Sequence, residues 1–289
     1  MVLRRDWHQL PLQFYKNMKS IRQIVLAVVM FGTFGSAMAQ YEDWTFPKTA
    51  VAERKVIPYR YIREGNVRWS KRIDRVIDVR EKMNKIMDWP RSPFYRVIHD
   101  NVMKGVLKPY RNDSLTSIYT PEEILKRGTR DFVTQVENPL DPDNPIDSTV
   151  TIPFDPASIK KYRIMEDWIF DHNYSDFRAK IIAIAPLFKP IFAGVELGEQ
   201  PIYWVKMDDL RPIIVNVELF NADNDAARLS YDDFFQMRQF SSYIVKESNM
   251  YDMDINLFDE FKDDGIAAQL ESDRIKNDLF ILEHDLWQY

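Results

Sequence analysis

The chain has 289 residues, of which 45% are hydrophobic and 29% charged, which is the composition of an ordinary globular protein. It contains no cysteine, and this excludes disulfides, thiolate nucleophiles and cysteine-bound zinc or iron–sulfur clusters. Its net charge of −5 makes nucleic acid a poor partner.

The first 39 residues follow the three-part pattern of a secretory signal peptide. Lys16, Lys19 and Arg22 form a basic segment, and an apolar run over Ile24–Phe34 follows it. This run is shorter than the roughly 20 apolar residues that a transmembrane helix needs. A buried core helix is the alternative interpretation. We predict a signal peptide over residues 1–39, with an upstream extension over residues 1–17 because Met18 resembles a natural start.

Small residues mark the expected cleavage point. Ala37 and Ala39 stand at the two positions that a signal peptidase reads, and Gln40 follows them. A bacterial lipoprotein needs a cysteine at this point, so we expect residues 40–289 to be exported as a soluble domain without a lipid anchor.

Charge is unevenly distributed along the chain. Residues 41–110 carry 16 basic and 9 acidic side chains, whereas residues 111–289 carry 18 basic and 34 acidic ones. The imbalance is either ordinary solvated charge or a means of attracting neighbouring copies head to tail, the kind of contact that builds rings or filaments.

The first predicted helix spans Arg68–Met87. Apolar residues from Trp69 onward recur there every three or four positions, with opposite charges between them, and Pro90 bars its continuation. Capping residues and glycine or proline stops predict further helices over residues 94–103, 121–127, 157–170, 230–240 and 265–287.

Strands are predicted where isoleucine, valine and phenylalanine are enriched. These segments are residues 131–137, 148–152, 177–185, 203–220 and 241–246, with a hairpin joining 106–111 to 115–119. Helices and strands mix without regular alternation, so we predict one α+β domain with an antiparallel or mixed sheet.

No pattern of catalytic residues is evident. The sequence has no phosphate-binding glycine loop, no G-x-S-x-G elbow and no H-E-x-x-H. His99, His172 and His284 lie far apart in the sequence and are more often structural than metal-binding. We therefore predict no catalytic, metal-binding or cofactor-binding residues.

Acidic residues leave one alternative open. The pairs Asp208–Asp209 and Asp232–Asp233 can in principle do acid–base work, so a periplasmic hydrolase or a ligand-binding protein with an acidic site is the second hypothesis. The segment Asp141–Asp147 resembles a calcium loop, but it lacks the glycine at position 6 and has Ile152 where a glutamate is needed.

Two blocks of sequence resemble the GldN/PorN family. The first, over Trp69–Asn84, follows a W-x-K-R-x-x-R-x-I-D-x-R-E-K-x-N pattern, hereafter the family pattern. The second is Ile164–Asp171, followed by Ile181–Pro186.

The resemblance implies a non-enzymatic component of the type IX secretion system, which supports protein secretion and gliding motility. Its implied partners are an outer-membrane lipoprotein of the GldK/PorK type, with which it forms periplasmic rings, and a motor protein of the GldM/PorM type. The implied location is the periplasm, attached to the outer membrane through the lipoprotein. We predict Lys71, Arg72, Arg75 and Lys82 as interface residues on the polar face of the first helix, with a solvated helix face as the alternative.

Overall fold

The computed structural model describes residues 50–286, apart from 139–140, 153, 193–194, 197, 222–223 and 225. These residues belong to one compact unit, Thr49–Tyr289. The predicted cleavage residues Ala37, Ala39 and Gln40 lie outside the described residues.

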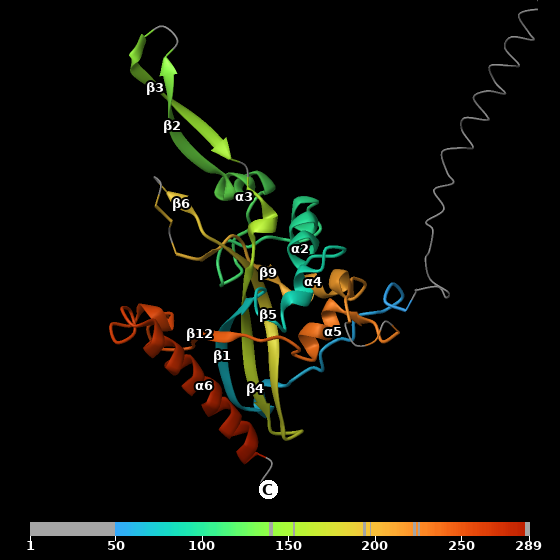
Figure 1. Cartoon of the computed structure of the whole chain (residues 1–289). Coiled ribbons are helices and arrows are strands. Elements are labelled where there is room, and N and C mark those ends of the chain that lie inside the picture. Colours follow the sequence, from blue (N-terminus) through green and yellow to red (C-terminus); the bar gives the residue numbers. More distant parts are fainter. Residues whose placement is uncertain are drawn as a thin grey trace, which may run out of the picture. The chain divides into compact units, whose positions relative to one another are not determined.

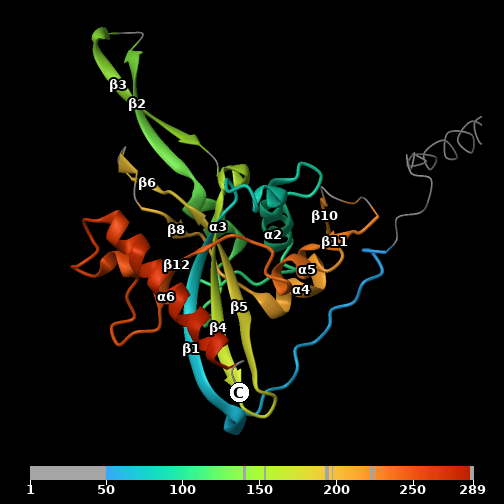
Figure 2. The same ribbon diagram turned by 60° about the horizontal axis from the view of Figure 1, so that its bottom comes forward.

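The centre of this unit is a six-stranded antiparallel sheet. The strand order is β12-β1-β4-β5-β8, and β9 also pairs with β5. The strands are β1 (Val67–Asp78), β4 (Lys161–Asp171), β5 (Asp176–Phe188), β8 (Gln200–Pro201), β9 (Val205–Lys206) and β12 (Tyr243–Glu247). Figure 1 and Figure 2 show the long strands β1, β4 and β5 side by side. The prediction of an α+β domain with an antiparallel sheet is confirmed.

Three two-stranded hairpins accompany the main sheet. They pair β2 (Arg130–Asn138) with β3 (Asp141–Ile152), β6 (Ile191–Phe192) with β7 (Val195–Glu196), and β10 (Glu218–Leu219) with β11 (Leu229–Ser230). The β2–β3 hairpin extends away from the main sheet past helix α3 (Pro121–Gly128; Figure 1). The segment that resembles a calcium loop begins β3, so its backbone is an extended strand.

The helices around the sheet are α2 (Phe94–Met103), α3 (Pro121–Gly128), α4 (Met207–Ile214), α5 (Tyr231–Gln236) and α6 (Gly265–Asp285), with short 3-10 turns η1 (Glu64–Asn66), η2 (Lys85–Asp88), η3 (Pro156–Ser158) and η4 (Ile255–Leu257). Helices α2, α4 and α5 lie on one side of the sheet, and α6 lies on the other side (Figure 2). Helix α4 packs against β5, and α6 packs against β12 at the opposite edge.

Local capping signals located several helices correctly. Thr120 accepts a hydrogen bond from the Glu123 amide, and the Glu123 side chain accepts one from the Thr120 amide, which is the predicted capping box. Helix α5 begins with the same arrangement between Ser230 and Asp233. The predictions of α2, α3 and α6 are confirmed, and α5 is shorter than predicted.

The predicted first helix over Arg68–Met87 is wrong, because these residues form β1 and the turn after it. The second half of β1 is buried on both faces, so its apolar residues do not alternate with exposed polar ones. Asp74, Arg75 and Asp78 are themselves buried. The apolar residues of this segment therefore recur three and four positions apart, which is the spacing typical of a helix.

Two further predictions are corrected for related reasons. The predicted helix over 157–170 is η3 followed by β4; alternating Tyr162, Ile164 and Trp168 mark the strand, but the buried Glu166 interrupts the apolar pattern. The predicted strand over 203–220 contains the short buried helix α4, since an apolar run alone does not separate a buried strand from a buried helix.

The predicted hairpin between 106–111 and 115–119 is reduced to an isolated bridge between Tyr110 and Ile118. Tyr110 also bridges Trp204, so this segment joins the chain just before β9.

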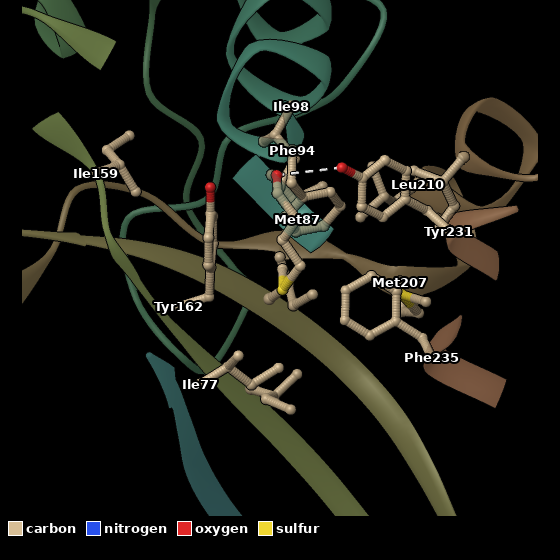
Figure 3. Packing of buried hydrophobic residues seen from close by; sticks show 14 of the residues in the cluster. Ile77, Met87, Phe94, Ile98, Ile159, Tyr162, Met207, Leu210, Tyr231 and Phe235 are labelled. Carbon is tan, nitrogen blue, oxygen red and sulfur yellow. Dashed lines mark hydrogen bonds between the residues drawn. The ribbon is translucent and has the colours of Figure 1, made fainter. Parts of the chain in front are cut away.

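The main hydrophobic core fills the space between the sheet and helices α2, α4 and α5 (Figure 3). The ring of Phe94 lies 5.0 Å from the rings of Tyr162 and Tyr231 and 5.2 Å from that of Phe235. The Tyr231 hydroxyl donates to the carbonyl of Met87 at 3.2 Å. Aromatic side chains in these tilted contacts contribute both buried area and favourable ring geometry.

A second core lies beneath α6. Ile275 and Leu279 of the helix pack with Ile73 of β1 and Ile244 of β12. The Ser272 hydroxyl accepts a hydrogen bond of 2.9 Å from the Ile244 amide. Helix α6 thus covers the edge strand β12 and satisfies one of its outward amides, which limits unwanted strand pairing at this edge.

Candidate functional site

The family pattern lies at the middle of the main sheet. Strand β1 carries most of it and has β12 on one side and β4 on the other. Side chains alternate between the two faces of a strand, so the charged residues of the pattern divide between the faces. Each face has to be considered separately.

One face carries a ladder of ion pairs, hereafter the charged face. Arg72 of β1 lies opposite Asp167 of β4, and its Nε donates to Asp167 Oδ1 at 2.8 Å. Arg163 donates to Asp74 at 2.8 Å and to Asp254 at 2.6 Å. The ladder therefore ties β1 to β4 and to the loop after β12.

Burial raises the pKa of Asp74, and the Arg163 guanidinium opposes that rise. The Asp74 carboxyl is only 3% exposed, so it depends on its guanidinium partner to remain charged. Lys246 of β12 extends the ladder, since its Nζ lies 2.6 Å from Asp252 Oδ1. These groups are held in place by one another, which suits a rigid surface.

The other face buries a single carboxylate, Glu166, among cations. Glu166 is fully buried, and Arg238 donates to both of its oxygens at 2.9 and 3.1 Å. Trp168 Nε1 donates to Oε2 at 3.0 Å. Arg75 Nε lies 3.2 Å from the same oxygen. The two guanidinium carbons lie 5.4 and 5.2 Å from the Trp168 ring, close enough for cation–π attraction.

Burial lowers the pKa of Arg75, the Glu166 carboxylate opposes this, and the charge of Arg238 adds to the lowering. A buried carboxylate shared by two arginines fixes the relative position of β1, β4 and the turn before β12. Removing one member would leave an uncompensated buried charge.

The remaining polar residues of the family pattern also serve the fold. Lys71 Nζ lies 2.6 Å from Glu247 Oε1 of β12. The Asn84 side chain donates to the carbonyls of Asp78 and Ser241, at 2.8 and 2.9 Å, and accepts from the Ser241 amide at 2.9 Å. The pattern thus describes a central strand and its attachments.

The structure separates the four predicted interface residues. They lie on β1 and the turn after it, so the premise of a helix face is wrong. Lys71 and Arg72 are engaged in ion pairs within the chain. Arg75 is 6% exposed and lies beside Glu166. An interface role for Lys71, Arg72, Arg75 and the exposed Lys82 stays a prediction.

Of the two acidic pairs considered for acid–base chemistry, Asp232–Asp233 has structural contacts and Asp208–Asp209 is exposed. Asp232 accepts two hydrogen bonds from the buried Arg211, at 2.8 and 3.1 Å. Asp233 caps α5 and pairs with Arg54. Asp208 and Asp209 are exposed in the first turn of α4.

The three histidines of the domain are dispersed. His99 is buried, and that burial lowers its pKa, whereas His172 and His284 are exposed. Within the described part of the chain, no group of three histidine, aspartate or glutamate side chains is arranged to hold a metal ion. Among the same residues, no helix is long and apolar enough to cross a membrane.

Helix α6 has an unusual outer face. Its buried side consists of Ala268, Ser272, Ile275 and Leu279. On the opposite side, at helical spacing, lie the exposed apolar residues Ile266, Leu270, Phe280 and Ile281, hereafter the outer face of α6. Leu270 and Phe280 are each 64% exposed. Sequence reasoning missed this face, although two apolar stripes on opposite sides of one helix are a recognisable pattern.

Comparison with known families gives one match. The family described as "Gliding motility associated protein GldN" matches residues 62–288. None of the curated proteins compared with the chain matches it. The match covers β1, the strands and loop that form the charged face, and α6.

Proposed function

The chain belongs to the GldN family of gliding-motility-associated proteins, and from this premise we propose that it is a non-enzymatic structural subunit of the type IX secretion system. In this role it forms periplasmic rings with an outer-membrane lipoprotein of the GldK/PorK type and contacts a motor protein of the GldM/PorM type. It supports protein secretion and gliding motility by assembling, not by turning over a substrate.

The outer face of α6 is the observation that carries an assembly role. Monomeric proteins rarely expose contiguous apolar surface beyond what their interactions need. Here two pairs of apolar side chains are exposed on the side of α6 away from its own core, Ile266 with Leu270 and Phe280 with Ile281, and the exposed Asp273, Arg274 and Asn277 lie between the pairs. We assign this surface to contact with the next subunit of the ring.

The buried ion pairs support the same role. Glu166 with its two arginines, and Asp74 with Arg163, connect neighbouring strands from both faces of the sheet. A scaffold subunit has to transmit force without changing shape, and cross-strand ion pairs of this kind hold strands in register.

The leader sequence and the cysteine content support a periplasmic location at the outer membrane. The signal-peptide pattern over residues 1–39 directs export, and a chain without cysteine has no site for a thioether-linked lipid. The subunit is then held at the outer membrane by its lipoprotein partner.

The test compares two exposed leucines. Leu270→Glu on α6 should reduce co-purification with neighbouring subunits and reduce both secretion and gliding by at least tenfold, because a charge is forced into an apolar contact. Leu125→Glu on α3 is the matched control, since Leu125 is also exposed, at 45%. Both variants should retain the wild-type urea midpoint. Normal assembly, secretion and gliding with Leu270→Glu would remove α6 from the interface.

A further inference from the structure

A small basic pocket opens beside the buried Glu166. It has a volume of about 250 Å³, and its walls include Arg75, Arg238 and Lys276, together with the hydroxyl-bearing Ser241 and Ser242. No carboxylate lines it among the residues that the structure describes. Three cations from β1, from the loop before β12 and from α6 therefore converge on one space.

Glu166 does not neutralise this group of cations. Its two oxygens accept hydrogen bonds from Arg238 and Trp168, and Arg75 Nε lies 3.2 Å from Oε2 in an ion pair with the same carboxylate. One carboxylate thus faces two guanidinium groups, with Lys276 in addition. The positive charge around the pocket therefore exceeds the single negative charge of Glu166, and a bound anion would offset the excess.

We propose that this pocket binds the carboxylate of an aspartate or glutamate side chain presented by another polypeptide. Apolar side chains of Met83 and Phe240 complete the walls and suit a planar carboxylate on a short stem. A dianionic phosphate would meet greater repulsion from Glu166 behind the arginines. The pocket is independent of ring formation, because it offers the same charges to any chain that carries an acidic residue.

The surroundings favour a polypeptide over a small carboxylic acid. The pocket shares Ser241, Ser242 and Lys276 with a groove of about 550 Å³ between β12 and α6. Because this groove continues from the pocket, it can hold the residues that flank an acidic side chain in a polypeptide. Glu81 and Asp273 line this groove but not the pocket, so negative charge flanks the site while the pocket itself stays positive.

The first experiment measures the pocket directly. Trp168 Nε1 reports on it, because this group donates to the carboxylate that both arginines face. Protein with ¹⁵N-labelled tryptophan, assigned with Trp168→Phe, is titrated with sodium acetate at pH 7.5. We expect the Trp168 resonance to shift and saturate with half-saturation at or below about 10 mM, whereas sodium chloride at equal ionic strength gives no saturable shift.

Two comparisons make this titration decisive. Lys276→Gln should weaken acetate binding about fivefold, and Lys262→Gln, an exposed lysine outside the pocket, should leave it unchanged. Equal shifts with acetate and chloride, or no change in Lys276→Gln, would overturn the site. Tighter binding of inorganic phosphate than of acetate would overturn the carboxylate assignment.

The second experiment identifies the source of the carboxylate. A photo-crosslinking amino acid replaces the exposed Met83 at the pocket wall, and the full chain is irradiated in the living bacterium. Mass spectrometry should identify an attached polypeptide segment with an aspartate or glutamate near the crosslink. Lys276→Glu should abolish that product, and Lys262→Glu should not. Crosslinks that survive Lys276→Glu, or the absence of any attached polypeptide, would overturn a polypeptide ligand.

Discussion

At the scale of single residues, the degree of burial decides how much each ion pair contributes to the stability of this protein. Glu166 and Asp167 are neighbours on β4 that point to opposite faces of the sheet. Glu166 is fully buried between Arg75 and Arg238, whereas Asp167 pairs with Arg72, whose side chain is 53% exposed. The same chemistry therefore has very different energetic weight on the two faces.

This difference gives a direct test by substitution. Glu166→Gln should lower the free energy of unfolding by about 3–5 kcal/mol, because two buried guanidinium groups lose their carboxylate. Asp167→Asn, one position away, should lower it by about 1 kcal/mol or less. Urea unfolding followed by circular dichroism measures both. Similar losses for the two variants would contradict the distinction between the faces.

The pH dependence of stability has one identifiable contribution. Burial lowers the pKa of His99 below its ordinary 6.5, with Asp100 opposing the change. Tyr203 faces the ring with its hydroxyl 3.5 Å from Nδ1, and Phe154 packs against it. As the pH falls through 6.5, His99 becomes protonated in the unfolded chain while it stays neutral in the folded chain. The stability that His99 burial allows is therefore fully present above that pH. It is lost as the pH falls toward the folded pKa.

His99→Gln should therefore reduce the loss of stability between pH 7.5 and 5.5. The contribution amounts to at most about 1.4 kcal/mol per pH unit. His172→Gln, at an exposed histidine, is the control and should keep the wild-type dependence. Urea midpoints across this range provide the measurement, and an unchanged slope in His99→Gln would count against the assignment.

At the scale of elements, α6 completes the sheet by covering β12. Ser272 is 4% exposed and accepts from the Ile244 amide. Ser272→Ala should lower the free energy of unfolding by about 1–3 kcal/mol, because the buried amide loses its acceptor. Hydrogen exchange at Ile244 should accelerate correspondingly. Gln269→Ala, at an exposed site on the same helix, should change neither, and equal exchange rates in the two variants would refute the edge-covering role.

The elements that sequence predicted correctly are those with local signals. Thr120 and Glu123 specify the start of α3, and Ser230 specifies the start of α5. Strands β1 and β4 were missed because buried charged residues, such as Asp74 and Glu166, break the alternation of apolar and polar side chains that marks a strand. Glu166 at a core position looks like a solvent-facing helical residue until Arg75 and Arg238 are seen beside it.

The placement of the predicted site residues was wrong for a related reason, because it too depended on contacts between residues far apart in the sequence. The family pattern was recognised from its residues, but its charges were assigned to a surface that does not exist in the fold. Arg75 was expected on a helix face and is buried in a strand. The basic pocket could not be predicted, since it requires the position of α6 against β12, whereas the outer face of α6 was missed although apolar residues on two sides of one helix are visible in the sequence.

At the scale of the whole molecule, the chain combines a rigid sheet with two surfaces suited to other polypeptides. One is the apolar outer face of α6, and the other is the basic pocket at the inner side of the same helix. Contacts through the outer face of α6 can join neighbours head to tail and close into a ring when the rotation permits, whereas the basic pocket is a separate site for an acidic side chain.

The mass of the native particle tests this account most directly. Outer membranes are extracted in mild detergent, the epitope-tagged protein is purified, and the particle mass is measured by mass photometry. We predict one very large particle that contains many copies of this chain together with a lipoprotein. A particle with the mass of a single copy and no lipoprotein would contradict the role as a ring subunit.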